Sequence, residues 1–242
     1  MPLCVAANQP SRSHVKGDME IGSTFELTQN ATNATNFRSA LWAIIDAVKP
    51  TDIWLPDYFC PSVHHNLTEA KHYKVWFSDG KTHCVVPPLK NGDLFVAVNY
   101  FGFQNNEAFE VPNGVTVVED MSMSAYLEPH QRSDFWIINL RKFFPLPDGA
   151  LVFSRKRIPL KLYLDPPEEW WATNLSAMSL RAAGADRSLW YAMTKEAKKQ
   201  NPFGPYRMSD YSAKRVSVVH DQKAWSRRRL NYNELMVSGL KP

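Results

Sequence analysis

One segment of the chain carries a clear helical pattern of apolar residues. From Phe37, further apolar residues follow after three, four, seven, eight and eleven positions, and the last of them is Val48. This spacing is typical of an amphipathic helix. Pro50 comes two residues later and is a residue that stops helices. The sequence therefore predicts a helix that begins near Asn36 and ends before Pro50.

Short runs rich in β-branched and aromatic residues recur after this helix. Because the runs are almost continuously apolar, they predict strands covered on both faces, as in a parallel or mixed sheet layered between helices. The predicted fold class is α/β, with three α/β/α layers and a mostly parallel sheet. The runs cover residues 53–55, 74–77, 94–98, 115–118, 135–138 and 150–153.

The remaining segments suggest how the chain is divided. Residues 1–22 lack apolar periodicity and are expected to form a flexible arm before a large domain at 23–200. After Ser154, a stretch bearing Pro and Trp runs through Trp171, and helical patterns follow at about 176–199 and 208–240. Residues 201–242 are expected to form a turn and a long helix.

Composition excludes several classes of protein. The 28 basic and 24 acidic residues give a net charge of +4, and no long stretch is basic alone, so nucleic-acid binding is not predicted. No apolar run reaches the ~18 residues that span a bilayer, and no signal peptide is evident. Cys4, Cys60 and Cys84 lack the paired spacing of a zinc site. These features predict a cytoplasmic protein that does not enter a membrane.

The polar residues that follow the predicted strands are candidates for chemistry, because ligands of open α/β sheets bind beyond the carboxyl ends of the strands. Asp120 comes just after one run, and Lys142 comes shortly after the next. A lysine can hold the aldehyde of pyridoxal phosphate as a Schiff base, and a carboxylate can keep the pyridine nitrogen protonated. The predicted helix start, with Arg38 and Ser39, offers N–H groups and positive charge for a phosphate.

Each of these residues also has an ordinary structural explanation. An acidic residue after a strand often caps a helix or faces solvent, and Lys142 alone could be an exposed amine. Arg38 and Ser39 could simply begin a helix. Their occurrence together, in order and at one sheet edge, favours the cofactor site.

Several segments resemble the DegT/DnrJ/StrS aminotransferases, enzymes of fold type I, and in particular a branch with an SLRK-type lysine motif. The most specific match is 139–149, which is similar to the lysine segment of that family. The resemblance implies the large domain of a fold type I transferase with pyridoxal 5′-phosphate as cofactor. The matching segments are 36–41 (NFRSAL), 55–63 (LPDYFCPSV), 99–102 (NYFG), 118–120 (VED), 139–149 (NLRKFFPLPDG), 204–209 (GPYRMS) and 227–232 (RRRLNY).

The resemblance also implies a role for individual residues. Lys142 would be the Schiff-base anchor and the proton shuttle, and Asp120 would pair with the pyridine nitrogen. The phosphate would lie at the backbone of Arg38 and Ser39, with Asn139 in place of the usual serine. The remaining implied contacts come from residues 58–60, where Phe59 and Cys60 would lie against the ring.

Four positions depart from the family pattern. Phe37 stands in place of a glycine at the helix start, and Asn139 in place of a serine. Met123 replaces a glutamine or histidine, and Pro205 replaces an asparagine. Family members are also expected to continue past the position of Pro242 with a small domain of roughly 100 residues.

Three functions remain open. The first is an aminotransferase that moves an amino group from an amino acid to a nucleotide-linked keto sugar. The second is a relative that binds the cofactor without catalysis, and the third is a structural or interaction module. The family resemblance further implies a homodimer.

Overall fold

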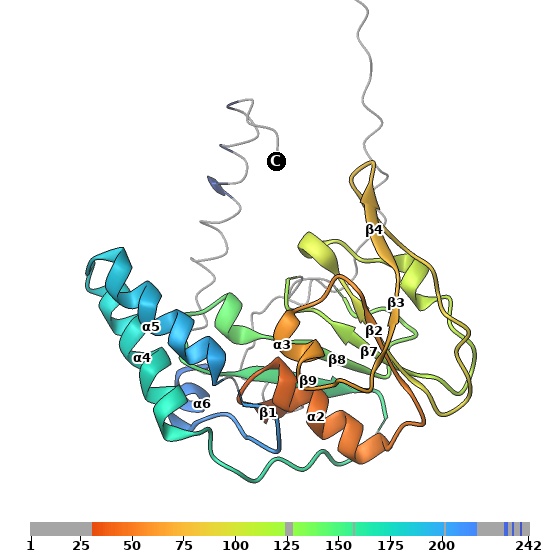
Figure 1. The fold of residues 1–242 in the computed structure, drawn as a ribbon, viewed down its shortest axis with the longest axis horizontal. Coiled ribbons are helices and arrows are strands. Elements are labelled where there is room, and N and C mark those ends of the chain that lie inside the picture. Colours follow the sequence, from red (N-terminus) through yellow and green to blue (C-terminus); the bar gives the residue numbers. More distant parts are fainter. Residues whose placement is uncertain are drawn as a thin grey trace, which may run out of the picture.

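The computed structural model describes residues 31–123, 128–156, 158–200 and 202–216, together with Leu230, Asn231, Glu234 and Ser238. These residues form an α/β fold around a mostly parallel central sheet (Figure 1). The predicted fold class is therefore confirmed in its α/β character and its sheet. The predicted N-terminal arm, most of the helix expected to 240 and the arginines at 227–229 lie outside the described residues.

The central sheet has seven strands in the order β1-β9-β8-β7-β6-β2-β3. Strands β3, β2, β6, β7 and β8 run parallel to one another, whereas β9 is antiparallel to β8 and β1 is antiparallel to β9. Strand β1 consequently points the same way as β8. The bounds are β1 Thr32–Ala34, β2 Ile53–Pro56, β3 Lys71–Tyr73, β6 Leu94–Val98, β7 Thr116–Asp120, β8 Phe135–Ile138 and β9 Ala150–Ser154.

Helix α2 (Phe37–Val48) confirms the helix predicted from the apolar spacing. Asn36 has an extended backbone, and its side-chain Oδ1 accepts a hydrogen bond from the Ser39 N–H at 2.9 Å, which is a standard N-cap. The helix ends at Lys49, whose φ of 49° is left-handed. Pro50 cannot continue the helix beyond that point.

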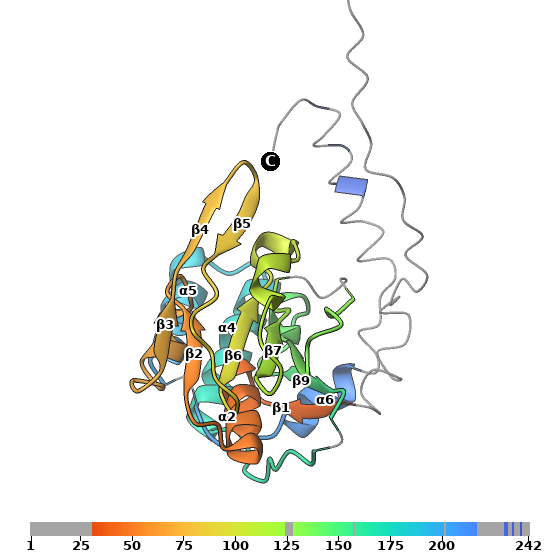
Figure 2. The ribbon, with the colours of Figure 1, turned by 90° about the vertical axis from the view of Figure 1, so that its right-hand side faces the viewer.

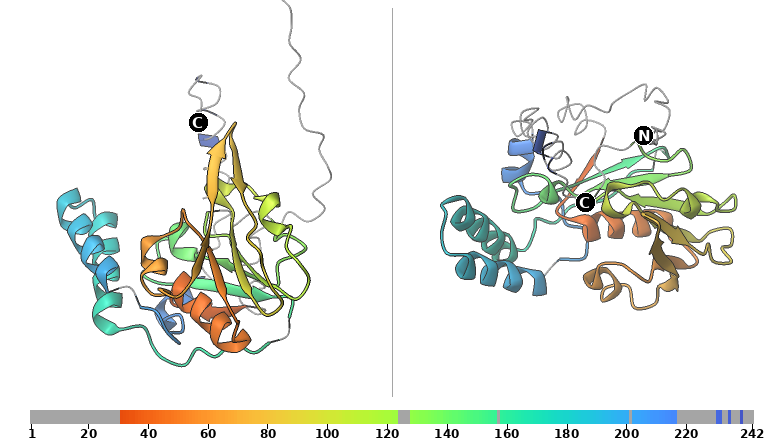
Figure 3. Two further views of the ribbon diagram at one scale, coloured as in Figure 1. Left: turned by 45° about the vertical axis from the view of Figure 1, so that its right-hand side comes forward. Right: turned by 90° about the horizontal axis from the view of Figure 1, so that it is seen from above.

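The other helices surround the sheet unevenly. Helix α2 covers one face, and α6 (Asp210–Val216) lies on the opposite face (Figures 2 and 3). Helices α4 (Glu168–Ala182) and α5 (Arg187–Lys199) pack against each other as a hairpin to one side of the sheet (Figure 1). Short helical turns follow several strands: α3 (Pro61–His64), η2 (Tyr100–Gly102), η3 (Asn106–Phe109) and η4 (Leu140–Lys142).

Two groups of buried apolar residues stabilise these layers. The larger group joins α2 to the sheet and includes Leu41, Ile44, Leu94 and Phe95, all fully buried. The smaller group, which contains Leu151 and other residues of β8, β9 and η4, receives Met208 and Val216 from around α6. The near-continuous apolar strands are thus covered on both faces, as their sequence predicts.

The prediction for residues 74–77 was right about a strand but wrong about its burial in the main sheet. Strand β4 (Val75–Ser78) pairs only with β5 (Lys81–Cys84), in a separate antiparallel hairpin that projects from the sheet (Figure 2). Trp76 and Phe77 are 43% and 42% exposed, so this run is not a buried strand. The turn between β4 and β5 is Asp79-Gly80, and both residues have positive φ. This dipeptide is a hairpin signal that the sequence contains.

The helical pattern expected at 176–199 divides into two helices. Helix α4 already begins at Glu168, within the stretch expected to be irregular, and α5 begins at Arg187. Gly184, with a φ of 73°, separates the two helices and reverses the chain.

Candidate active site

The predicted site residues meet at one edge of the sheet because of the strand directions. Strands β2, β6, β7 and β8 are parallel, and β1 shares their direction, so all of their carboxyl ends lie at one edge. This edge carries the start of α2, the 57–60 loop, Asp120 at the end of β7, and η4 with Lys142. It is the position where open α/β sheets bind ligands.

Asp120 is a buried carboxylate with a raised pKa. It is 6% exposed, and its Oδ1 accepts a hydrogen bond from the Ser122 N–H at 2.8 Å. Burial raises the pKa of Asp120, while the positive charge of Lys142 acts in the opposite direction. Lys142 itself is exposed, and its ammonium has no hydrogen bond or ion pair with the residues that the structure describes. The structure therefore brings the predicted carboxylate and the predicted lysine within electrostatic reach of each other.

The start of α2 is already capped by the chain itself. The Oδ1 of Asn36 accepts a hydrogen bond from the Ser39 N–H, and the Nδ2 of Asn36 donates to the Pro202 carbonyl at 3.1 Å. Ser39 is fully buried, and its hydroxyl has no hydrogen-bond partner among the residues that the structure describes. The helix N-terminus thus offers one unsatisfied hydroxyl, while the amide of Ser39 is engaged.

Arg38 lies just inside this helix start and is 5% exposed. Its Nη1 donates to Ser62 Oγ at 2.8 Å, and its Nε donates to the Pro202 carbonyl at 3.3 Å. Burial lowers the pKa of Arg38 to about 10; the nearby Cys60 raises it and Arg141 lowers it further. The Cys60 thiol is 3.2 Å from Ser62 Oγ. Arg38 and Cys60 are therefore brought together, with Ser62 between them.

Aromatic rings from separate loops also gather at this edge. Phe59 is partly buried, and its ring lies edge-to-face against Phe37 at 5.7 Å between centroids. Tyr58, 57% exposed, contacts the rings of Phe77 and Tyr100 at 5.3 and 5.7 Å. The predicted ring-binding segment at 58–60 therefore presents aromatic surface to solvent beside the site.

Three further positions of the family comparison have defined surroundings. Asn139 is 7% exposed, and no described residue forms a hydrogen bond with its Oδ1. Met123 is 38% exposed. The Pro205 carbonyl accepts the N–H groups of Tyr163 and Leu164 at 2.9 and 3.0 Å, which makes Pro205 part of the local backbone structure.

Asp148 is an important residue that sequence reasoning missed, although it lies within the lysine motif. It is fully buried, and its two oxygens accept hydrogen bonds from Thr35, Ser209 and Ser212. These donors come from the end of β1 and the start of α6. Asp148 therefore links the end of β1 to the start of α6. The Pro-Asp-Gly sequence is a turn signal, but the distant donors were not visible in it.

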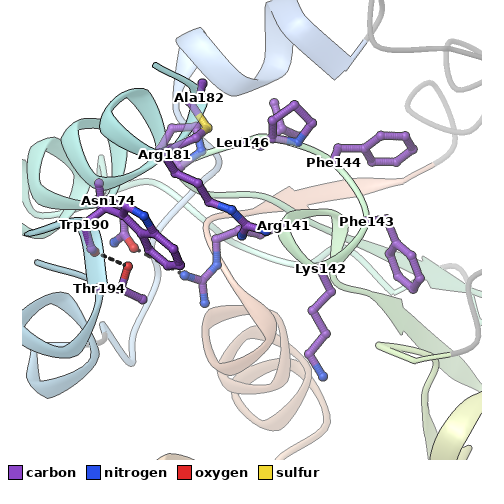
Figure 4. Close-up of a pocket in the computed structure, with 14 residues that line it drawn as sticks. Arg141, Lys142, Phe143, Phe144, Leu146, Asn174, Arg181, Ala182, Trp190 and Thr194 are labelled. Atoms are coloured by element: carbon purple, nitrogen blue, oxygen red, sulfur yellow. Dashed lines mark hydrogen bonds between the residues drawn. The ribbon is translucent and has the colours of Figure 1, made fainter. Parts of the chain in front are cut away.

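A cavity of about 560 Å³ opens beside η4 (Figure 4). Its walls come from residues 141–147 on one side and from the α4–α5 hairpin on the other. Arg141 and Lys142 lie at its border, and Arg181 and Trp190 line the helical side.

Within the described ranges, no cluster of three or more His, Cys, Asp or Glu side chains could hold a metal ion. None of the helices in those ranges has the length and apolar character to cross a membrane.

Comparisons with known proteins find likeness only among solved structures, since no protein-family model and no curated protein matches the chain. NtdA from Bacillus subtilis, with bound cofactor PMP, is 12% identical at a TM-score of 0.44, over 52% of this chain and 33% of its own. A NifS-like protein from Rickettsia africae is 10% identical at a TM-score of 0.40, over 65% and 53%. SPT with PLP is 16% identical at a TM-score of 0.38, over 57% and 42%.

The chain thus spans from a third to about half of the length of these structures. At such identities and scores the likeness concerns part of the fold and carries no statement on function.

Proposed function

We propose that this chain binds pyridoxal 5′-phosphate through Lys142 and Asp120 and is the cofactor-holding large domain of an aminotransferase. The observation that supports this most directly is the buried Asp120 carboxylate within electrostatic reach of Lys142, at the carboxyl edge of a parallel sheet. The proposed substrates are an amino acid as donor and a nucleotide-linked keto sugar as acceptor, and the proposed assembly is a homodimer.

The residues at the sheet edge fit the cofactor at two places. Lys142 offers an exposed amine for the aldehyde, and Asp120 offers a carboxylate for the pyridine nitrogen. For the phosphate, the unsatisfied hydroxyl of Ser39 and the guanidinium of Arg38 are available donors. Asn36 already occupies the amide of Ser39, so the fit is better at the aldehyde and the ring than at the phosphate.

The bound cofactor supplies an electron sink that stabilises negative charge on the α-carbon of an amino acid. Lys142 would hold the cofactor by its aldehyde group, and its amine would be the base that takes a proton from the Cα of an amino acid substrate. Asp120 would accept a hydrogen bond from the pyridine N–H and hold its proton there. The Ser122 N–H and the charge of Lys142 would help to keep Asp120 ionised for this role.

A second candidate function is cofactor binding without catalysis. It is favoured by the start of α2, where the chain itself already uses groups that could hold the phosphate. Asn36 caps the helix, and the Pro202 carbonyl accepts hydrogen bonds from the side chains of both Asn36 and Arg38. The third function, an interaction module, is favoured by exposed aromatic residues such as Phe101 and Phe103, which are 62% and 66% exposed.

The test is to incubate the purified chain with pyridoxal phosphate, reduce it with borohydride and locate the adduct by mass spectrometry. We expect one adduct on Lys142, lost in Lys142→Ala and retained in Lys199→Ala, which removes an exposed lysine distant in sequence from η4. Labelling spread over several lysines and unchanged in Lys142→Ala would overturn the cofactor proposal.

A further measurement separates the enzyme from the idle binder. The loaded chain is mixed with L-glutamate without reduction, and the released cofactor is analysed by mass. Appearance of the aminated cofactor together with 2-oxoglutarate supports the aminotransferase. A specific Lys142 adduct with no amination by glutamate or by other amino acids tested would support binding without catalysis.

A further inference from the structure

The cavity beside η4 carries two arginines, Arg141 and Arg181, that the proposed cofactor site does not use. Its volume of about 560 Å³ falls within the ~300–1,000 Å³ typical of small-molecule sites. Arg141, Lys142 and Arg181 are basic, and no acidic residue occurs among the described residues that line it. The cavity is therefore a positively charged space of the right size for a small organic ligand.

Arg141 is held at the wall of the cavity by a neutral partner. Its Nη1 donates to Asn174 Oδ1 at 3.3 Å, and Asn174, 8% exposed, is itself fixed by donation to the Trp170 carbonyl at 2.9 Å. Burial lowers the pKa of Arg141, while Asp148 and Cys60 act in the opposite direction. No carboxylate in the described part of the chain forms an ion pair with Arg141. An anion that entered the cavity would offset the cost of burying this charge.

Arg181 provides a second cation from the last turn of α4. It is exposed, and its guanidinium carbon lies 5.2 Å from the centre of the Trp190 ring. Figure 4 shows Arg141 extending from η4 toward the helices and Arg181 extending from α4 toward η4. Lys142 points away from both, toward α2 (Figure 4). The two guanidinium groups thus share one space, and the amine of Lys142 faces another.

The rest of the cavity wall is mostly apolar. Phe144, Leu146 and Met178 contribute to it together with Trp190. The hydroxyl of Thr194, one of the few other polar groups in the wall, donates to the Trp190 carbonyl at 2.8 Å and is engaged within the helix. A ligand of this cavity would therefore combine an anionic group with a compact apolar or aromatic body.

We propose that the cavity between η4 and the α4–α5 hairpin binds an organic anion, with Arg141 and Arg181 holding its phosphate or carboxylate group and Trp190 lying beside its body. Guanidinium groups suit both anions because their N–H groups match pairs of anionic oxygens. Lys142 borders this cavity, but Arg141 and Arg181 are not part of the proposed cofactor site, so the proposal does not depend on the cofactor.

The test is calorimetric titration of the cofactor-free full chain at low ionic strength with phenyl phosphate and with phenylacetate. These probes carry the same aromatic body and differ in the anionic group. We expect saturable binding of at least one probe, and the tighter of the two identifies the anion class. Binding that is no tighter than that of inorganic phosphate, or no saturable binding of either probe, would overturn the proposal.

Variants show whether the binding lies in this cavity. Arg181→Gln should weaken it about tenfold or more, which corresponds to ~1.4 kcal/mol, and Arg141→Gln should do the same. Arg187→Gln is the matched control, because Arg187 is also an arginine over an aromatic ring, that of Tyr191, but does not line the cavity. Equal weakening in all three variants would contradict the site. Arg181 is exposed, so its variant remains informative even where Arg141→Gln disturbs folding.

A last experiment distinguishes this anion site from a site for the cofactor phosphate. The titration is repeated after reduction of pyridoxal phosphate onto the chain. Binding that survives the modification of Lys142 supports a separate site, and binding that disappears would show that the cavity holds the cofactor phosphate. If no adduct forms, the proposed function fails, while the titration of the cofactor-free chain still decides the anion site.

Discussion

Replacement of Asp148 by asparagine should strongly destabilise the fold. One oxygen of Asp148 accepts from Thr35 Oγ1 at 3.2 Å and from the Ser209 N–H at 2.7 Å. The other accepts from Ser209 Oγ at 2.6 Å and from the Ser212 hydroxyl. In Asp148→Asn, whichever position receives the amide nitrogen loses its acceptor for two donors. The carboxylate is fully buried, so water cannot replace it.

Hydrogen bonds to a charged group contribute about 1.5–3 kcal/mol each. Two losses would therefore cost about 3–6 kcal/mol, and rotation of the serine and threonine hydroxyls to other acceptors should reduce this to about 2–4 kcal/mol. Against a typical stability of about 5–15 kcal/mol, the change is large. Urea unfolding of Asp148→Asn and of the parent chain, followed by circular dichroism, measures it.

The control is Asp165→Asn. Asp165 has a 71% exposed side chain and forms an ion pair with Arg207 at 2.6 Å, so its loss should change the free energy of unfolding by less than about 1 kcal/mol. If Asp148→Asn lowered the free energy of unfolding no more than this control does, Asp148 would not be the link between β1 and α6 that its hydrogen bonds indicate.

Two further predictions concern the proposed cofactor site. Asp120→Asn should stabilise the cofactor-free chain near neutral pH, because burial raises the pKa of Asp120 and makes its charged form unfavourable in the folded state. This gain in the free energy of unfolding should shrink as the pH falls from the raised pKa of Asp120 toward the ordinary pKa of an aspartate. Urea unfolding of both proteins over a pH series tests this. A gain that grew toward acidic pH would contradict it. Asn36→Ala should lower the free energy of unfolding by about 1 kcal/mol through loss of the α2 cap. Denaturant unfolding measures this, and an unchanged free energy would mean that Ser39 finds another acceptor.

Local sequence patterns were sufficient for the elements with long or strongly apolar segments. Helix α2 was predicted because a helix buried along one stripe has apolar residues at helical spacing. Strands β6, β7 and β8 were predicted because strands buried on both faces are almost continuously apolar. Strands β1 and β3 have only three residues each, and their pairing depends on distant partners. For the 74–77 run, apolar character alone did not show that β4 pairs outside the main sheet.

The candidate site was predictable only in part for the same reason. Asp120 and Lys142 follow neighbouring strands, so the order of strands along the chain was enough to suggest that they meet. The partners of Arg38 and Asp148 lie far away in sequence, Pro202 at 164 positions and Thr35 at 113. Such contacts arise from tertiary packing, and no local sequence pattern predicts them.

The two carboxylates at the end of β7, Glu119 and Asp120, have different surroundings. Glu119 is fully buried, and it accepts hydrogen bonds from Asn99 Nδ2 at 2.6 Å, the His130 N–H at 2.8 Å and Ser133 Oγ at 2.5 Å. These hydrogen bonds tie loops together and satisfy the buried carboxyl group of Glu119.

Asp120 comes next in the strand, so its side chain points to the opposite face. It receives a backbone hydrogen bond from Ser122 and the charge of Lys142, and burial still raises its pKa. The surroundings therefore stabilise the ionised form of Asp120 incompletely. Under the proposed function, a protonated ring nitrogen placed beside the carboxylate would provide the missing stabilisation.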